Sequence, residues 1–170
     1  QVFKISVTLN LLGFSISQIV WGPLSDRYGR KAILQYSYIL AIAGTVLAML
    51  ALNIEMYLIG RLIEGFAVGS AAPIGRAIMA DSLNKIALAK VYSQYAIAAL
   101  LPPAIGPIIG GYLLVYLGWR AIFVFFLILA LFYFIAVWKY FDNTNQPDPN
   151  HRIFFQVKQS IIIITSSRYF

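Results

Sequence analysis

The residues best able to do chemistry in this sequence are three charged side chains inside an apolar run. Arg61, Glu64 and Arg76 lie within residues 56–80, where every other side chain is uncharged. A charge at the centre of a bilayer costs at least about 2.5–3.5 kcal/mol on insertion scales, so it is retained where it is paired or faces a polar cavity. We therefore interpret these residues as candidates for an ion pair, a proton-binding site or both.

Arg61 and Glu64 are three residues apart and can meet on one side of a helix. Burial favours the neutral form of a carboxyl group, whereas a neighbouring arginine favours its charged form. These effects oppose each other at Glu64 and leave two interpretations open: a carboxyl group that takes up and releases protons, or a static ion pair. Arg61 is the firmer candidate because a guanidinium keeps its charge.

The composition places these charges in a membrane protein. The chain is 61% hydrophobic and 11% charged, whereas soluble domains are about 45–50% apolar and about 25% charged. A helix needs roughly 20 apolar residues to cross a bilayer. The sequence therefore predicts an all-α membrane protein with five transmembrane helices, at about residues 5–24, 32–52, 56–80, 91–117 and 121–138.

Polar and small residues share single faces of two of these spans. Such a face contacts another helix or a water-filled cavity, and the sequence leaves both interpretations open. The first span carries Ser6, Asn10, Gly13 and Ser17 on one face, with Asn10 a candidate cavity residue. The third carries Arg61, Gly65, Gly69, Ala72 and Arg76.

Basic residues between the spans predict the orientation of the protein. A tight, basic turn is expected at residues 22–31 and a further loop at residues 81–90. Cytoplasmic loops are enriched in lysine and arginine, so both loops and the C-terminal tail are expected in the cytoplasm. Nine basic residues lie on this side, Arg27, Arg30, Lys31, Lys85, Lys90, Lys139, Arg152, Lys158 and Arg168, against Lys4 and Arg120 on the other.

Several classes of function find no support in the residues. The net charge of +7 is explained by the cytoplasmic loops, so we expect no nucleic-acid partner. The sequence has no cysteine, and its one histidine, His151, has no partner ligand nearby, so no metal site is expected. No nucleophile with a base and no phosphate-binding loop is present, and we expect neither an enzyme nor a cofactor.

The stretch between the first two spans carries a family resemblance. It resembles the signature loop between the second and third helices of the major facilitator superfamily at every position, through Gly22, Asp26, Arg27, Gly29, Arg30 and Lys31. The resemblance implies that Arg30 pairs with Asp81 at the end of the third span, as a partly buried latch that serves as a gate; the alternative is a solvated surface pair. It also implies that Asp26 faces the other half of the protein.

Two more motifs narrow the resemblance. Residues 61–65 are similar to a motif of the fourth helix, with Glu64 in place of the usual Gln, and residues 73–81 resemble the Bcr/CflA-type drug:proton antiporters. An antiporter motif of the fifth helix is matched by Gly106, Pro107, Gly110 and Gly111, with Pro102 in place of its leading Gly. These residues are expected to pack closely against neighbouring helices and to bend the span. They would either seal the cavity against proton leak or serve only as small-residue packing contacts, and the two roles are compatible.

The resemblance implies a twelve-helix protein of which this chain supplies helices two to six. Residues 1–141 would form a transmembrane bundle without its first helix, and residues 142–170 the cytoplasmic central linker and the approach to the next helix. The implied function is proton-coupled export of a small organic molecule or drug by alternating access; the alternatives are an uptake permease or a non-transporting membrane protein. The expected partners are the lipid bilayer of the inner (plasma) membrane, the substrate, protons, the missing first helix and the C-terminal half.

Overall fold

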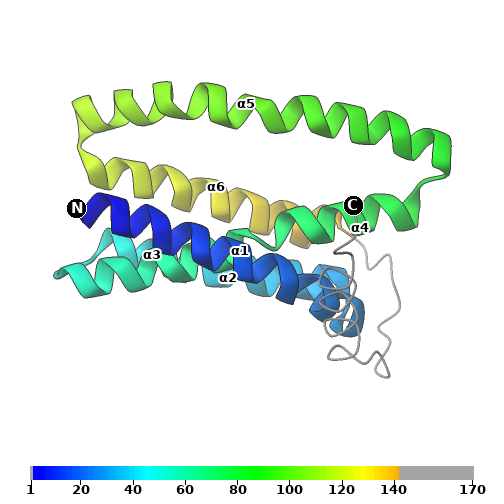
Figure 1. Cartoon of the computed structure of the whole chain (residues 1–170), viewed down its shortest axis with the longest axis horizontal. Helices are drawn as coiled ribbons and strands as arrows, with labels where there is room; N and C mark the ends of the chain where they lie inside the picture. The colour runs from blue at the N-terminus through cyan, green and yellow to red at the C-terminus, as the bar shows by residue number, and fades with distance from the viewer. Residues whose placement is uncertain (1, 142–170) are drawn as a thin grey trace, which may run out of the picture.

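The computed structural model describes residues 2–141, and all secondary structure within them is helical (Figure 1). The helices lie lengthwise along the molecule, and the chain reverses at every junction except that between α3 and α4. The expected linker at residues 142–170 lies outside the described residues. The helices are α1 (Val2–Tyr28), α2 (Arg30–Met49), α3 (Ile54–Val68), α4 (Ala71–Ser82), α5 (Lys85–Leu117) and α6 (Trp119–Tyr140).

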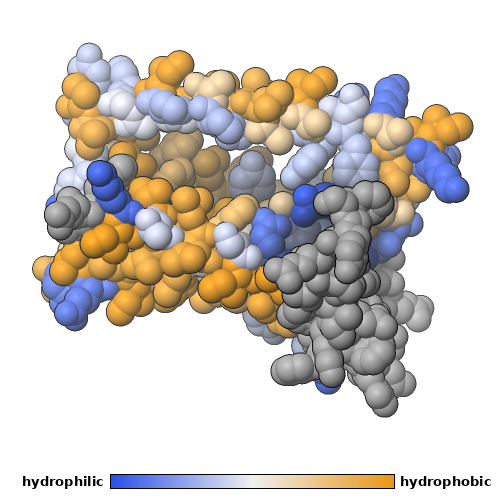
Figure 2. Space-filling model, in the orientation of Figure 1, coloured by the Kyte–Doolittle hydropathy of each residue, from blue (hydrophilic) through white to orange (hydrophobic). Residues whose placement is uncertain are grey.

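The five predicted spans are confirmed. Five segments of the described chain are long and apolar enough to cross a membrane: Lys4–Tyr28, Arg30–Met49, Ile54–Ser82, Lys85–Leu117 and Trp119–Tyr140. Figure 2 shows apolar residues over much of the lateral surface and hydrophilic residues gathered toward the two ends. We call the end where α1 joins α2 the Gly29 end, and the end where α5 joins α6 the Gly118 end.

The turn between the first two spans is much shorter than the predicted residues 22–31. Helix α1 continues to Tyr28 and α2 begins at Arg30, so Gly29 alone lies between them. Gly29 has a φ of 93°, in the left-handed region that costs a glycine little. Its amide donates to the Ser25 carbonyl at 3.0 Å. The loop expected at 81–90 is likewise reduced to Leu83 and Asn84, and the Asn84 side chain accepts from the Ala87 amide at 2.9 Å.

The third span is broken in its middle, which the sequence did not predict. Gly69 and Ser70 separate α3 from α4. The Ser70 hydroxyl donates to the Ser37 hydroxyl of α2 at 2.7 Å, and a Cβ at Gly69 would overlap the Ser17 side chain of α1. Contacts with two other helices therefore hold these two residues. Both keep dihedral angles of the right-handed helical region, so α4 continues the direction of α3.

Helices α1, α2 and α3 form the closely packed part of the bundle. A Cβ at Gly65 would overlap the Asn10 backbone of α1, and a Cβ at Gly44 would lie 2.7 Å from the Glu64 nitrogen. Small residues at such positions let helix backbones approach in a membrane. Toward the Gly29 end, the Trp21 indole nitrogen donates to the Phe66 carbonyl at 2.8 Å and the two rings pack at 5.2 Å.

Helix α5 stands apart, and the expected close packing of its motif is wrong for the described residues. It has no buried residue, and no atom lies within 4 Å of a Cβ built at Gly106, Gly110 or Gly111. Among the described helices it contacts mainly α6 and α4, and Figure 1 shows it set apart from α1, α2 and α3. It also remains one helix from Lys85 to Leu117 with three prolines inside it.

Candidate functional site

The site is built on the ion pair of α3. Arg61 Nη1 lies 2.6 Å from Glu64 Oε2, and the two side chains are 17% and 8% exposed. The Asn10 side chain of α1 donates to the Arg61 carbonyl at 2.9 Å, which anchors this turn of α3 to its neighbour. The structure thus brings three of the four predicted cavity residues together in the interior of the bundle.

The ion pair opens on a cavity of about 630 Å³ between α5 and the other helices. We call this the central cavity, and a hollow is visible there in Figure 2. Its polar lining includes Asn10, Thr45 and the Arg61–Glu64 pair, together with three tyrosines, Tyr38, Tyr95 and Tyr133. The remaining lining is apolar, including Phe14, Phe126 and Leu129. This arrangement can hold a small molecule beside a buried charge pair.

The sequence analysis missed the tyrosines and Thr45. Tyr38, Ala41 and Thr45 recur at helical spacing along α2, so a search for polar residues on one face would have found them. Tyr38 and Tyr133 stack with centroids 6.0 Å apart. Arg76, by contrast, does not join the site. It lies on α4 beyond the break and is exposed, and its carbonyl accepts from the Tyr92 hydroxyl at 3.5 Å.

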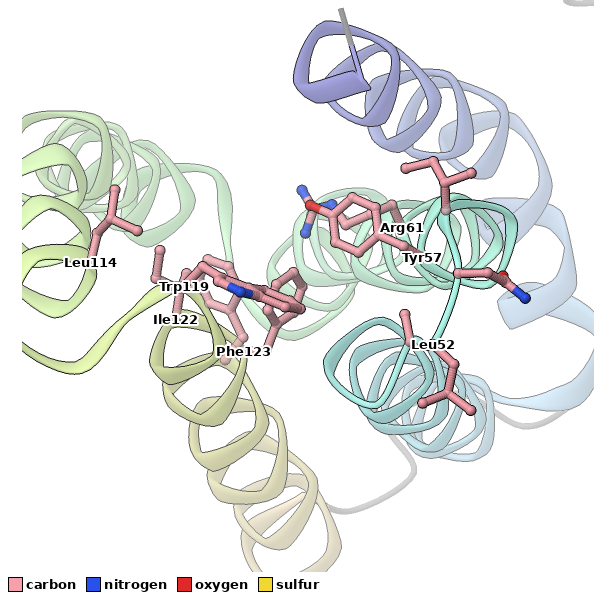
Figure 3. A pocket seen from close by; sticks show the side chains of 11 residues that line it. Leu52, Tyr57, Arg61, Leu114, Trp119, Ile122 and Phe123 are labelled. Carbon is pink, nitrogen blue, oxygen red and sulfur yellow. The ribbon is translucent and has the colours of Figure 1, made fainter.

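A second cavity of about 730 Å³ opens toward the Gly118 end, and we call it the Gly118-end cavity (Figure 3). Its wall carries Tyr57, Trp119 and Phe123, whose rings meet edge to face at 6.0–6.3 Å. The Arg61 guanidinium lies 5.8 Å from the Phe123 ring centroid. Arg61 and Phe126 line both cavities, so they form the boundary between them.

A second charged cluster lies at the Gly29 end. Arg30 Nη2 is 2.7 Å from Asp81 Oδ2 of α4 and 3.4 Å from Asp26 Oδ1 of α1. The Arg30 side chain is 6% exposed, and its Nε and Nη1 have no partner among the described residues. The pairing of Arg30 with Asp81 is present as expected. Asp26, which was expected to face another part of the protein, also contacts Arg30.

The other signature residues lie on α1 and at the start of α2. The Arg27 guanidinium lies 5.2 Å from the Tyr28 ring centroid, and Lys31 is half-buried at the start of α2. Gly22 has no neighbour within 4 Å of a built Cβ. Within residues 2–141 no three histidine, cysteine, aspartate or glutamate side chains gather as metal ligands would.

Comparison with known proteins identifies the family. A family model for the Major Facilitator Superfamily matches residues 1–168. An uncharacterized transporter of Rickettsia felis is 33% identical over 138 residues, which cover 81% of this chain and 34% of that protein. The multidrug transporter MdfA of Escherichia coli is 30% identical over 139 residues, 82% of this chain and 34% of its own length.

A fungal relative extends the comparison. The efflux pump FUB11 of Gibberella moniliformis is 36% identical over 122 residues, which are 71% of this chain and 20% of that protein. The chain therefore spans about a third or less of the length of these relatives. The match over residues 1–168 and the five apolar spans establish that this multi-pass membrane chain belongs to the major facilitator superfamily.

Proposed function

We propose that the chain is part of a secondary transporter that exports a small organic molecule in exchange for protons, by alternating access. The observation that carries the proposal is the buried Arg61–Glu64 pair at the edge of the central cavity. A charge pair inside a membrane is costly and marks ion or substrate pathways. Ligand sites commonly have volumes of about 300–1,000 Å³, and the central cavity is within this range.

The proton step follows from the geometry of the pair. A proton that binds Glu64 Oε2 neutralises the carboxylate and removes its attraction for Arg61 Nη1, which now lies 2.6 Å away. A cargo that binds in the central cavity beside the ionised carboxylate loses that charge interaction when the proton binds, and is released. Loss of the same proton to the other side of the membrane restores the ion pair. Proton binding and cargo binding would in this way alternate at one site.

The Arg30 cluster would serve as the gate. Arg30 starts α2 and Asp81 lies one residue before the end of α4, so their contact ties two helices at the Gly29 end. Alternating access requires one end of a transporter to open while the other is closed. Breaking the Arg30–Asp81 contact would release α4 at this end. The names of the relatives, a multidrug transporter and an efflux pump, favour export as the direction.

The test uses the complete protein reconstituted in liposomes that carry a trapped pH-sensitive dye. With a proton gradient imposed, addition of a lipophilic cargo such as ethidium should discharge the gradient. The ethidium should move in the direction opposite to the protons. Uptake in the direction of proton flow would favour a permease. Absence of any cargo-dependent proton movement with a broad panel of small organic molecules would contradict the proposal.

A further inference from the structure

A third hollow, of about 530 Å³, lies between α1 and α2 near the Gly29 end. We call it the α1–α2 hollow, and it shares no lining residue with the central cavity or the Gly118-end cavity. Every residue of its lining is within eight positions of Gly29, which is about 12 Å at ~1.5 Å of rise per residue. The hollow therefore lies within the depth of one leaflet of the ~30 Å bilayer core. Its lining consists of Trp21, Leu24 and Tyr28 of α1 and Ala32, Ile33 and Tyr36 of α2.

The lining combines an apolar floor with exposed phenol rings. Trp21 and Ile33 are buried, and the Trp21 indole nitrogen already donates to the Phe66 carbonyl at 2.8 Å. The floor can therefore accept a hydrocarbon chain without leaving this donor unpaired. Tyr28 and Tyr36 are 54% and 66% exposed, and tyrosine is enriched where the hydrocarbon core meets the headgroups. The lining thus fits a ligand that is apolar at one end and polar at the other.

Two cations accompany the hollow. The Arg27 guanidinium lies 5.2 Å from the centroid of the Tyr28 ring, and Lys31 directly precedes the part of α2 that lines the hollow. Neither cation has an ion-pair partner within residues 2–141, because the two carboxylates of the neighbouring cluster contact Arg30 instead. The positive charges of Arg27 and Lys31 are therefore available to an anion from outside the described chain.

We infer that the α1–α2 hollow binds a phospholipid with an anionic headgroup. One acyl chain lies over Trp21 and Ile33, and the phosphate lies at Arg27 and Lys31. Basic pockets between membrane helices bind anionic headgroups, and the cytoplasmic leaflet, which the Gly29 end is predicted to face, carries anionic lipid. The inference does not depend on any transport activity.

Charge and size favour this occupant over the alternatives. A zwitterionic headgroup carries its own cation, which offsets the attraction of its phosphate for Arg27 and Lys31. Water would have to wet the apolar floor at Trp21 and Ile33. A further membrane-spanning helix is about 30 Å long, whereas the hollow extends over about 12 Å of helix rise.

Photocrosslinking of lipid to the complete protein tests the inference. The protein is reconstituted in phosphatidylcholine vesicles that contain a small fraction of photoactivatable phosphatidylglycerol, with a diazirine in its acyl chain. A parallel sample contains a photoactivatable phosphatidylcholine with identical chains. After irradiation, mass spectrometry identifies the peptides that carry lipid. Within residues 21–36 we expect the phosphatidylglycerol probe to give about tenfold more adduct than the phosphatidylcholine probe, because two cations act on its headgroup.

Three variants separate the headgroup from the hollow. Arg27→Gln combined with Lys31→Gln should reduce the phosphatidylglycerol yield at residues 21–36 to that of phosphatidylcholine. The matched control is Arg120→Gln at the Gly118 end, where the guanidinium lies 4.4 Å from the Trp119 ring centroid, and it should leave the yield at residues 21–36 unchanged. Ala32→Phe keeps both cations and fills the hollow, so it should lower the yield of both probes.

Several outcomes would overturn the inference. Equal yields of the two probes at residues 21–36 would mean that bulk lipid covers this surface without selection by charge. Absence of lipid adducts there would mean that another part of the protein, or a second copy, covers it. A preference for phosphatidylglycerol that survives in the folded double variant would exclude Arg27 and Lys31 as the headgroup site. If the double variant does not fold, an undiminished yield in Ala32→Phe would contradict the inference by itself.

Discussion

Glu64 is the residue on which the proton step depends. Its ion-pair partner among residues 2–141 is Arg61, at 2.6 Å, and little of the Glu64 side chain is exposed. Glutamine keeps the shape of the side chain and cannot exchange a proton. We expect Glu64→Gln in the complete protein to abolish proton-coupled export and to remove its dependence on pH, as measured by dye efflux across a series of pH values.

A control on the same helix tests whether the loss of any carboxylate from α3 has this effect. Glu55 is an exposed carboxylate in the first turn of α3, and Glu55→Gln should leave export and its pH profile unchanged. If Glu64→Gln also leaves both unchanged, the pair is a static structural element and Arg61 remains the functional candidate of the two.

Gly65 controls how closely α1 and α3 approach. A Cβ there would overlap the Asn10 carbonyl oxygen, whereas a Cβ at Gly75 of α4 would meet nothing within 4 Å. Alanine is otherwise favoured over glycine in a helix by roughly 1 kcal/mol. Gly65→Ala should therefore lower the melting temperature of the purified protein, while Gly75→Ala leaves it equal or raises it. Equal melting behaviour of the two variants would mean that α1 and α3 are not in contact here.

At the scale of helices, the break in the third span depends on a buried hydrogen bond. Ser70 donates to Ser37, which itself donates to the Leu34 carbonyl at 2.8 Å. Hydrogen bonds between membrane helices contribute about 0.6 kcal/mol on average and up to about 1.7 kcal/mol. We expect Ser70→Ala to lower the free energy of unfolding by an amount in this range, measured in a mixed-micelle denaturation series.

A double-mutant cycle assigns that loss to the contact itself. Once Ser37 is alanine, the further change Ser70→Ala should cost much less than it does in the parent protein, because the two hydroxyls act as a pair. Full additivity of the two changes would show that the hydrogen bond does not stabilise the break.

The contact between α2 and α4 depends on charge. Arg30 is buried and lies 2.7 Å from Asp81 but 3.4 Å from Asp26. Asp81→Asn should therefore lower the free energy of unfolding by about 1 kcal/mol, the upper part of the range for partly exposed pairs. Asp26→Asn should cost less, and the exchange of both charges in Arg30→Asp with Asp81→Arg should recover part of the loss. A larger effect of Asp26→Asn would reverse the assigned order of the two partners.

The spans could be predicted from the sequence because a helix needs apolar length to cross a bilayer, and that length is visible in composition. The break at Gly69 and Ser70 could not. Glycine and serine also occur inside continuous membrane helices, and here they lie against Ser17 and Ser37 of other helices, contacts that no local pattern shows. The extent of α1 was missed for a related reason, since polar residues can continue a helix beyond the membrane surface.

At the scale of the whole molecule, the sequence predicts orientation through its basic residues. The Gly29 end should face the cytoplasm. The described chain has no cysteine. Single introduced cysteines can therefore show, by their labelling, which end faces the cytoplasm. In a complete protein whose other cysteines are removed, Glu55→Cys at the Gly118 end should react with a membrane-impermeant maleimide in intact cells. Ile86→Cys, at an 86% exposed position near the Gly29 end, should react only after permeabilisation. The opposite labelling pattern would mean that the Gly118 end faces the cytoplasm.

The charged pairs of the candidate site could be predicted from the sequence, whereas the lining of its cavity could not. The spacing of Arg61 and Glu64 within one helix indicated their pairing, and the family resemblance indicated Arg30 with Asp81. The tyrosines that line the central cavity come from α2, α5 and α6. Their meeting depends on how three helices cross, which no local pattern encodes. The open face of α5 was missed because a glycine motif indicates close packing without indicating the partner.

The close packing of α3 against α1 and α2 has a consequence for the synthesis of the protein. Both main partners of α3 precede it in the chain, so a three-helix unit can assemble once residues 2–68 have entered the membrane. Domains tend to fold as units in the order of their synthesis. Helix α5 enters later and meets mainly α6, which follows it. We therefore expect the ion pair to be buried on one side early in biogenesis, and the cavity beside it to close only when the last helices arrive.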